Sequence, residues 1–259
     1  MRRIVVVALL AAMIPAGARA EVKTRTVEYE HDGVTLEGLV AWDDARQGKR
    51  PGVLIVHDWM GVGPFVAEQA ERLARDGYVA FAADIYGKGV RPKDTKEAAA
   101  QAGKYRGDRA LLRARAAAGL AELRKSELTG SKVAAIGYCF GGGTVLELAR
   151  SGADVAGVVS FHGNLDTPNA ADAKSITGKV LVLHGADDPY VPADQVAAFE
   201  KEMRDAKVDW QMVHFGGAVH SFTNPRAGDD PSKGAAYDER AARRAWAHMQ
   251  QLFAELFPR

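Results

Sequence analysis

Short apolar runs and amphipathic stretches alternate along most of this chain. The apolar runs are rich in Val, Ile and Ala and predict strands buried on both faces, at residues 52–56, 78–85, 132–138, 155–161, 179–184 and 210–215. Helical periodicity lies between and after them, at residues 65–75, 105–125, 144–150, 194–204 and 237–257. This alternation predicts a mostly parallel sheet covered by helices on both faces, with ligands received at the carboxyl ends of the strands.

Three other stretches complete the predicted layout. Residues 27–43 alternate around a turn at His31-Asp32-Gly33, which predicts an antiparallel hairpin. Residues 87–106 and 225–234 are polar and rich in turn residues, so both are expected to be surface loops; the alternative is that one of them forms a lid over the substrate. No repeat or linker divides the chain, and we expect one domain over residues 21–259.

The first twenty residues have a different composition. Arg2 and Arg3 precede an apolar run from Ile4 to Ile14, and Ala18-Arg19-Ala20 follows a proline. Such a run is too short to span a bilayer, which takes about 20 residues. The pattern predicts a secretory signal peptide cleaved after Ala20, and hence export across the inner membrane to the periplasm.

Composition and charge narrow the classes of partner. Of the 259 residues, 47% are hydrophobic, which is typical of a globular chain. The 34 Lys and Arg nearly balance the 33 Asp and Glu, so the basic patch of a nucleic-acid binder is not indicated. We expect a monomer without stable membrane insertion after signal cleavage, acting on a small molecule.

The chain contains a single cysteine, Cys139. An intrachain disulfide and a zinc site built on several cysteines are therefore excluded. The seven histidines show no H-E-x-x-H or comparable spacing. We expect neither a metal nor a cofactor.

Cys139 occupies a nucleophile elbow. An apolar strand runs into a helix through Gly137-Tyr138-Cys139-Phe140-Gly141. The glycines two residues to either side relieve backbone collisions in the sharp turn, and the helix N-terminus behind it favours a thiolate. The alternative is a buried structural cysteine beside a glycine-rich turn.

Candidates for the acid and the base follow in the chain order of this arrangement. Asp187 and Asp188 lie just after the strand at 179–184, and His220 follows the strand at 210–215 through a glycine turn. A histidine on such a loop can reach the sulfur while a carboxylate holds its other nitrogen. His162, at another strand end, is the rival base.

Other groups have expected supporting roles. The backbone N–H groups of Phe140 and Trp59 are predicted to form the oxyanion hole. His57 is expected to shape the Trp59 loop through a hydrogen bond. His184 and His214 lie within strands, where buried, hydrogen-bonded imidazoles are common.

Four blocks together resemble the dienelactone hydrolase family of α/β-hydrolases. They are His57-Asp58-Trp59-Met60-Gly61, Gly137-Tyr138-Cys139-Phe140-Gly141-Gly142, Asp188-Pro189-Tyr190-Val191-Pro192 and His220-Ser221-Phe222. The resemblance implies an α/β-hydrolase fold over the whole chain after residue 20. It also implies that Cys139 is the nucleophile, that Asp188 rather than Asp187 orients the base, and that His220 is the base.

The resemblance also indicates where this chain departs from the family. It implies that Asp58 helps to activate the thiol, at a position where the best-known members have Glu. Those members have an arginine four residues after the histidine, whereas this chain has Asn224, with Arg226 two positions later. These two residues are therefore candidate substrate contacts, and the arginine that holds the carboxylate of an anionic dienelactone in those members is absent from its usual position.

The middle segment offers further candidates for substrate binding. Tyr105, Arg106 and Arg109 could supply contacts or charge, and the alternative is a solvated helix face.

The predicted function is hydrolysis of an ester, enol-lactone or thioester bond through an acyl-thioester intermediate. The alternatives are a binding or scaffolding protein that kept the fold, and a broad carboxylesterase or thioesterase.

Overall fold

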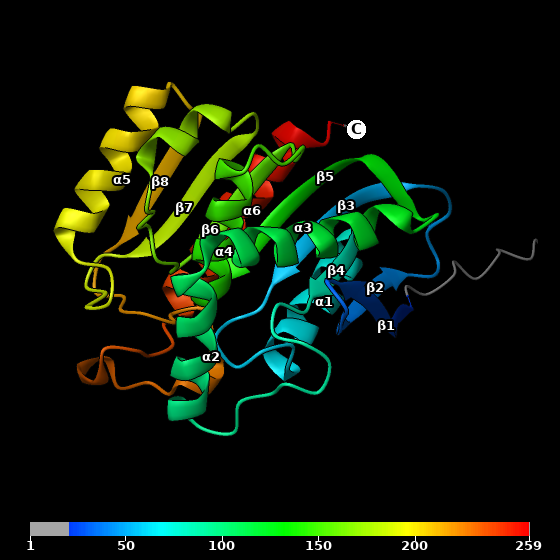
Figure 1. The fold of residues 1–259 in the computed structure, drawn as a ribbon, viewed down its shortest axis with the longest axis horizontal. Helices are drawn as coiled ribbons and strands as arrows, with labels where there is room; N and C mark the ends of the chain where they lie inside the picture. Colours follow the sequence, from blue (N-terminus) through cyan, green and yellow to red (C-terminus); the bar gives the residue numbers. More distant parts are fainter. Residues whose placement is uncertain (1–20, 259) are drawn as a thin grey trace, which may run out of the picture.

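The computed structural model describes residues 21–258, so the predicted signal peptide at 1–20 lies outside the described residues. Within this range eight strands form one sheet in the order β1-β2-β4-β3-β5-β6-β7-β8. Their bounds are β1 Val22–His31, β2 Val34–Asp43, β3 Arg50–Val56, β4 Val79–Ala83, β5 Thr129–Tyr138, β6 Gly157–Phe161, β7 Lys179–Gly185 and β8 Trp210–Phe215. The pairs β1–β2 and β2–β4 are antiparallel, and strands from β4 to β8 are parallel (Figure 1). The predicted α/β-hydrolase architecture is confirmed.

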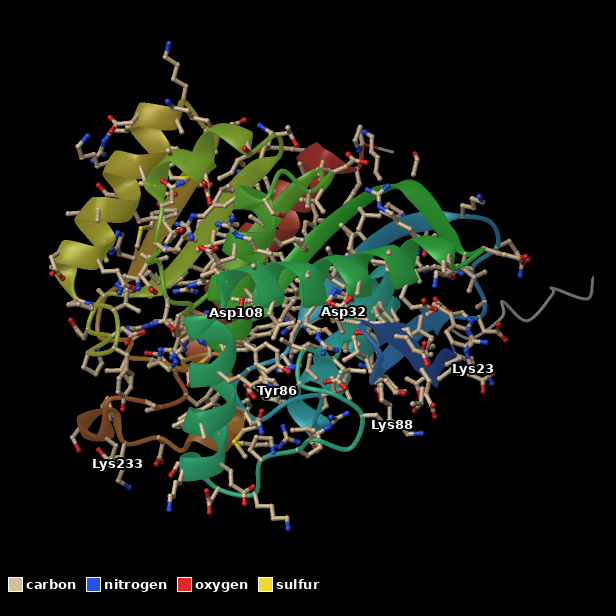
Figure 2. All side chains as sticks on the ribbon, in the orientation of Figure 1. Lys23, Asp32, Tyr86, Lys88, Asp108 and Lys233 are labelled. Atoms are coloured by element: carbon tan, nitrogen blue, oxygen red, sulfur yellow. The ribbon has the colours of Figure 1, made fainter. Side chains whose placement is uncertain are left out.

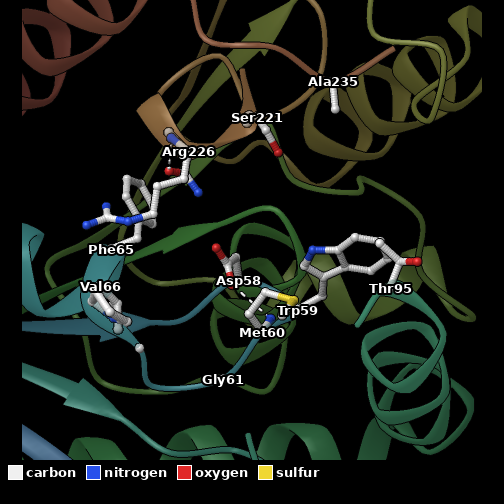
Figure 3. Close-up of a pocket in the computed structure, with 14 residues that line it drawn as sticks. Asp58, Trp59, Met60, Gly61, Phe65, Val66, Thr95, Ser221, Arg226 and Ala235 are labelled. Atoms are coloured by element: carbon white, nitrogen blue, oxygen red, sulfur yellow. Dashed lines mark hydrogen bonds between the residues drawn. The ribbon is translucent and has the colours of Figure 1, made fainter. Parts of the chain in front are cut away.

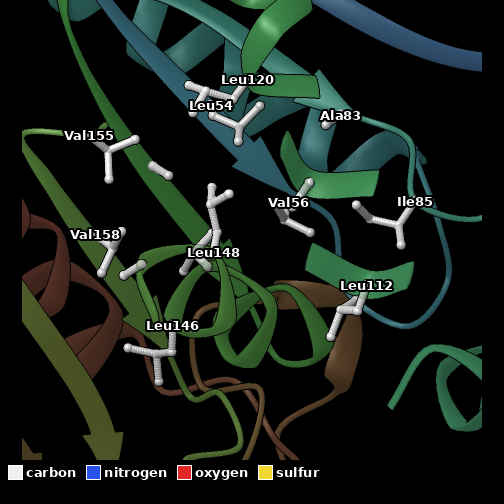
Figure 4. Close-up of a cluster of buried hydrophobic side chains, with 14 of the residues drawn as sticks. Leu54, Val56, Ala83, Ile85, Leu112, Leu120, Leu146, Leu148, Val155 and Val158 are labelled. Carbon is white, nitrogen blue, oxygen red and sulfur yellow. The ribbon is translucent and has the colours of Figure 1, made fainter. Parts of the chain in front are cut away.

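The helices cover both faces of this sheet. They are α1 Pro64–Asp76, α2 Thr95–Gly107, α3 Arg109–Lys125, α4 Phe140–Arg150, α5 Ala193–Ala206 and α6 Glu239–Leu256, with 3₁₀ turns η1 Ala170–Ser175, η2 Pro225–Ala227 and η3 Pro231–Lys233. Leucines and valines of α3 and α4 pack on one face of the sheet, as Figure 4 shows for Leu120 and Leu148 beside Leu54 and Val158. Side chains of α1 and α6 pack on the other face. None of the helices within residues 21–258 has the length and apolar character needed to cross a bilayer.

The predicted hairpin is confirmed and begins earlier, at Val22. Asp32 and Gly33 form its turn, both with positive φ (51° and 69°), as a type I′ hairpin turn requires. The hairpin places β2 beside β4, at one end of the sheet.

The predicted single helix at 105–125 is wrong, because Asp108 separates two helices. The Asp108 carboxylate accepts the N–H of Leu111 and caps the start of α3, directly after Gly107 ends α2. Figure 2 labels Asp108 at this junction. The prediction of a loop over all of 87–106 is also wrong, because α2 begins within this segment. Asp94 caps the start of α2, which buries Ala98, Ala102 and Tyr105 at helical spacing.

Helix α4 begins at Phe140, four residues before the predicted start at Thr144. The run of three glycines has low helix propensity, which delays the start predicted from sequence. Packing overrides the propensity, since a Cβ atom added at Gly142 would lie 2.8 Å from Cα of Gly163. Glycines therefore allow this helix to approach the sheet closely.

Two strand histidines have different environments. His184 is buried as expected, although its Nδ1 has no hydrogen-bond partner among the described residues. The prediction that His214 is buried is wrong, because it lies on the edge strand β8 and is exposed.

Candidate active site

The loops that carry the predicted site residues meet at the carboxyl end of the parallel strands. Strands β3 and β5 are neighbours at the centre of the sheet, while β4 lies on the far side of β3. The chain therefore changes direction between β3 and β5, and such a switch point leaves a crevice for ligands. The loop after β3 carries Trp59, and the turn after β5 carries Cys139.

Cys139 occupies a strained turn between β5 and α4. Its backbone has φ 54° and ψ −115°, a conformation that side chains rarely adopt. A Cβ atom at Gly137 would lie 2.0 Å from the carbonyl oxygen of Gly141, and one at Gly141 would lie 2.2 Å from that of Val56. Only glycine fits at both positions, which is the physical reason for the spacing of the motif.

Cys139, His220 and Asp188 form a continuous chain of contacts. The Nε2 atom of His220 lies 3.0 Å from Sγ of Cys139, and its Nδ1 atom lies 2.8 Å from Oδ2 of Asp188. The three residues are 7%, 8% and 5% exposed, respectively. The neighbouring carboxyl, Asp187, is exposed. The structure thus brings together the three residues predicted as nucleophile, base and acid.

Local backbone contacts hold the His220 loop in place. The His220 N–H donates to the carbonyl of Gly234, and its own carbonyl accepts the N–H of Ala236. The next residue, Ser221, has a positive φ of 58°. This turn directs the imidazole back toward the elbow.

The pKa of His220 is shifted strongly. Burial alone would lower it, but the adjacent sulfur of Cys139 and the hydrogen-bonded carboxylate of Asp188 favour the charged ring and raise it to about 10. A proton transferred from the sulfur to this imidazole would therefore be held there at neutral pH.

His162, the rival base, lies beside His220 and contacts a different partner. Its Nε2 atom lies 2.7 Å from the hydroxyl oxygen of Thr223, and its ring meets that of His220 edge-on at 5.3 Å. Burial and the neighbouring His220 hold its pKa well below the usual value. This environment favours a neutral ring that packs against the candidate base.

The Trp59 loop lies against the start of α4. Phe140 is the first residue of α4, so its N–H has no partner within the helix, and no hydrogen bond to the N–H of Trp59 is found among the described residues. The predicted loop-shaping role of His57 is confirmed: Nδ1 donates to the Asp58 carbonyl at 2.5 Å, and Nε2 accepts the Ile85 N–H at 3.2 Å.

The Asp58 carboxylate accepts the N–H of Met60 at 2.8 Å. This is the hydrogen bond that the structure records for it, rather than one to Cys139. Burial raises the pKa of Asp58, so its carboxyl group takes up a proton more readily than a surface aspartate.

The candidate substrate contacts of the middle segment separate into three environments. Arg106 lines the pocket at Cys139, and its guanidinium donates to Oδ1 of Asn164 at 2.5 Å. Tyr105 is buried, and its hydroxyl donates to the carbonyl of Tyr86, so it does not line the Cys139 pocket. Arg109 pairs with Asp166 at 2.6 Å.

The two candidates after the histidine lie in a neighbouring cavity. The side-chain oxygen of Asn224 accepts the N–H of Arg226. The Arg226 guanidinium makes two hydrogen bonds to Glu68, at 2.9 and 2.6 Å. Neither polar group is therefore directed at the sulfur.

Two adjoining cavities occupy this edge of the sheet. The cavity that contains Cys139 and His220 has a volume of about 200 Å³, and the second has about 540 Å³. Trp59, Ser221 and Ala235 line both. Figure 3 shows the larger cavity, with Asp58 and Met60 on one side and Arg226 and Phe65 on another. Within residues 21–258 no group of three or more His, Cys, Asp or Glu side chains is placed to hold a metal ion.

Comparison with known proteins identifies the family of this chain. The model of the dienelactone hydrolase family matches residues 36–257. The chain belongs to the dienelactone hydrolase family. It is therefore a hydrolase of ester or lactone bonds.

Individual relatives of this dienelactone hydrolase-like chain match over nearly their whole length. Protein usf of Aquifex pyrophilus is 29% identical over 88% of this chain and 97% of its own. The solved structure called m3DLH is 40% identical, covers 91% of this chain and 99% of its own, and has a TM-score of 0.88. A dienelactone hydrolase-like promiscuous phosphotriesterase from metagenomic libraries is 44% identical over 92% of this chain and 99% of its own, with a TM-score of 0.87.

Several residues of this site were not predicted from the amino-acid sequence. Asn164 and Tyr190 line the Cys139 pocket, and the ring of Tyr190 meets that of His220 at 5.3 Å. The Tyr86 hydroxyl donates to the carbonyl of Trp59 at 3.1 Å and so holds the loop that carries Trp59. A position just after a parallel strand is the signal that could have indicated Tyr86 and Asn164.

Proposed function

We propose that this hydrolase cleaves an ester or enol-lactone through covalent catalysis by Cys139. The observation that carries the proposal is the aligned contact from Cys139 Sγ to His220 Nε2 and from His220 Nδ1 to Asp188. A nucleophile, a base and a group that orients the base within hydrogen-bond reach form the arrangement that activates a side chain for acyl transfer.

In the first half of the reaction, His220 takes the proton of the thiol and the sulfur adds to the substrate carbonyl. The resulting oxyanion accepts hydrogen bonds from the N–H groups of Phe140 and Trp59. The carbon–oxygen bond to the leaving group then breaks, and His220 gives its proton to the departing oxygen. An acyl-thioester on Cys139 and a free alcohol or enol remain.

In the second half, His220 takes a proton from water and the hydroxide adds to the thioester carbonyl. The same two N–H groups stabilise the second oxyanion. The carbon–sulfur bond breaks, the acid leaves, and the sulfur regains its proton from His220. Asp188 keeps the imidazole in the required tautomer throughout.

Two further residues are assigned roles at this site. Asp58, whose pKa is raised by burial, has the proton affinity that a thiol-activating carboxyl requires. Arg106 lines the Cys139 pocket and contacts the neutral Asn164, so its charge is available to a polar part of the substrate.

Trapping of the acyl-enzyme tests the proposal. An activated aryl ester is mixed with the protein, the reaction is quenched in acid, and the mass of the peptide containing Cys139 is measured. We expect an acyl adduct on this peptide, a burst of phenol, and loss of both in Cys139→Ala. A protein that only binds ligands would show neither, and full turnover by Cys139→Ala would contradict the mechanism.

A further inference from the structure

The chemistry described above places no part of the substrate in the larger cavity. The cavity at the sulfur, about 200 Å³, is smaller than the 300–1,000 Å³ typical of ligand sites, whereas the adjoining cavity of about 540 Å³ lies within that range. Trp59, Ser221 and Ala235 line both. Ala235 also pairs with His220 through a backbone bridge, so the boundary between the cavities lies directly beside the base.

The walls of the larger cavity come from distant parts of the chain. Met60 follows β3, Phe65 and Val66 belong to α1, Thr95 begins α2, and Ala227 ends η2. Figure 3 shows Phe65 and Val66 on one side of the cavity and Met60 with Trp59 and Thr95 on another. These contributions make much of the lining apolar.

The charged and amide side chains of this cavity already have hydrogen-bond partners within the protein. The Asp58 carboxylate accepts the N–H of Met60, and the Asn224 side chain accepts the N–H of Arg226. Arg226 is the cation of the lining, and Glu68 neutralises it with two hydrogen bonds. A carboxylate on a ligand would find no unpaired cation there and would face the charge of Asp58.

From these contacts we infer that the larger cavity is a substrate subsite that takes an uncharged, ring-sized apolar substituent of the ester. This inference rests on the proposed function, because the substituent enters the cavity while the ester carbonyl lies at Cys139. The natural substrate is then a neutral ester with one bulky apolar group, bound across both cavities.

Methyl acetate, benzyl acetate and methyl phenylacetate test the subsite. The latter two add one ring, on the alcohol side and on the acyl side, respectively. We expect one of them to exceed methyl acetate in kcat/KM by about tenfold or more, since apolar contacts in a pocket discriminate by that order. Its 4-carboxylated analogue is expected to lose most of that gain.

Two substitutions outside the catalytic residues make the test specific. Ala227→Phe fills the cavity, and we expect it to abolish the gain for the ring while leaving methyl acetate unchanged; Ala227→Ser is the matched control that keeps the gain. Glu68→Gln frees Arg226, and we expect it to raise kcat/KM for the carboxylated analogue relative to the neutral ester. An equal effect of Ala227→Phe on all esters, or no preference for either ring, would overturn the inference.

Binding to Cys139→Ala separates this inference from the proposed mechanism. Calorimetric titration with the preferred ring-bearing ester, or with both ring-bearing esters if neither is turned over, is expected to show binding that Ala227→Phe weakens about tenfold. Turnover that survives in Cys139→Ala would show that Cys139 is not the nucleophile, but it would not contradict the subsite. Absence of binding, or binding insensitive to Ala227→Phe, would reject the subsite.

Discussion

The Sγ atom of Cys139 lies 3.0 Å from Nε2 of His220, although 81 residues separate the two in sequence. The sulfur stands at the start of α4, where the helix dipole favours negative charge, and the imidazole is backed by Asp188. The contact joins the end of β5 to the loop after β8, two strands that are not neighbours in the sheet.

Replacement of the sulfur by oxygen tests this contact. A serine hydroxyl is a much weaker acid than a thiol, so the proton transfer to His220 becomes costly. We expect Cys139→Ser to lower kcat by roughly 10³-fold while the fold is retained. Steady-state kinetics on an activated ester, with circular dichroism as the check on folding, measure this effect. Equal activity of the serine variant would argue against thiolate chemistry.

The alkaline limit of activity depends on Asp188. The pKa of His220 is raised to about 10 by Cys139 and Asp188, so its proton is available to the leaving group below that pH and is lost above it. Asp188→Asn removes one of the charges that raise this pKa. We therefore expect the alkaline limb of kcat/KM to move from near pH 10 to lower pH.

The matched control for this experiment is Asp187→Asn, since Asp187 is adjacent but exposed. Its pH profile is expected to coincide with that of the unaltered protein. A limb that stays near pH 10 in Asp188→Asn would show that Asp188 does not control the titration of His220.

The glycines of the elbow set the stability of the turn. A Cβ atom at Gly141 would lie 2.2 Å from a backbone oxygen, so Gly141→Ala is expected to destabilise the protein by about 3 kcal/mol or more. Gly103→Ala in α2 is the control, because a Cβ atom at Gly103 would meet nothing within 4 Å. This substitution is expected to stabilise the protein by about 0.5–1 kcal/mol. Urea unfolding curves measure both, and equal midpoints would contradict the steric argument.

A buried ion pair ties α4 to α5. The Arg150 guanidinium makes two hydrogen bonds of 2.8 Å to Glu202 and a third of 3.0 Å to Glu147, and all three side chains are buried. Glu202→Gln leaves part of a buried charge uncompensated, and we expect a loss of about 3–5 kcal/mol. Glu200→Gln removes a partner of the exposed Arg204 and should change the stability by less than about 1 kcal/mol. Thermal or urea unfolding of the two variants checks the difference.

The strand and elbow predictions succeeded because they depend on neighbours in sequence. A buried strand needs consecutive apolar residues, and the turn at Cys139 needs glycine two residues to either side. The positions of Asp187, Asp188 and His220 after strands predicted that these side chains would gather at the carboxyl edge of the sheet, and the family resemblance selected Asp188. The break at Asp108 was missed because Tyr105 to Lys125 carries apolar residues at helical spacing on both sides of it.

The amino-acid sequence by itself determined the alternation of strands and helices, the shape of the turn at Cys139 and the set of groups that could react. Only the tertiary structure decided that His220 rather than His162 contacts the sulfur, that Glu68 neutralises Arg226 from 158 residues away, and that a second cavity adjoins the first. Local propensity and periodicity act over a few residues, whereas these contacts depend on how α1 and the loops after β3 and β8 pack together.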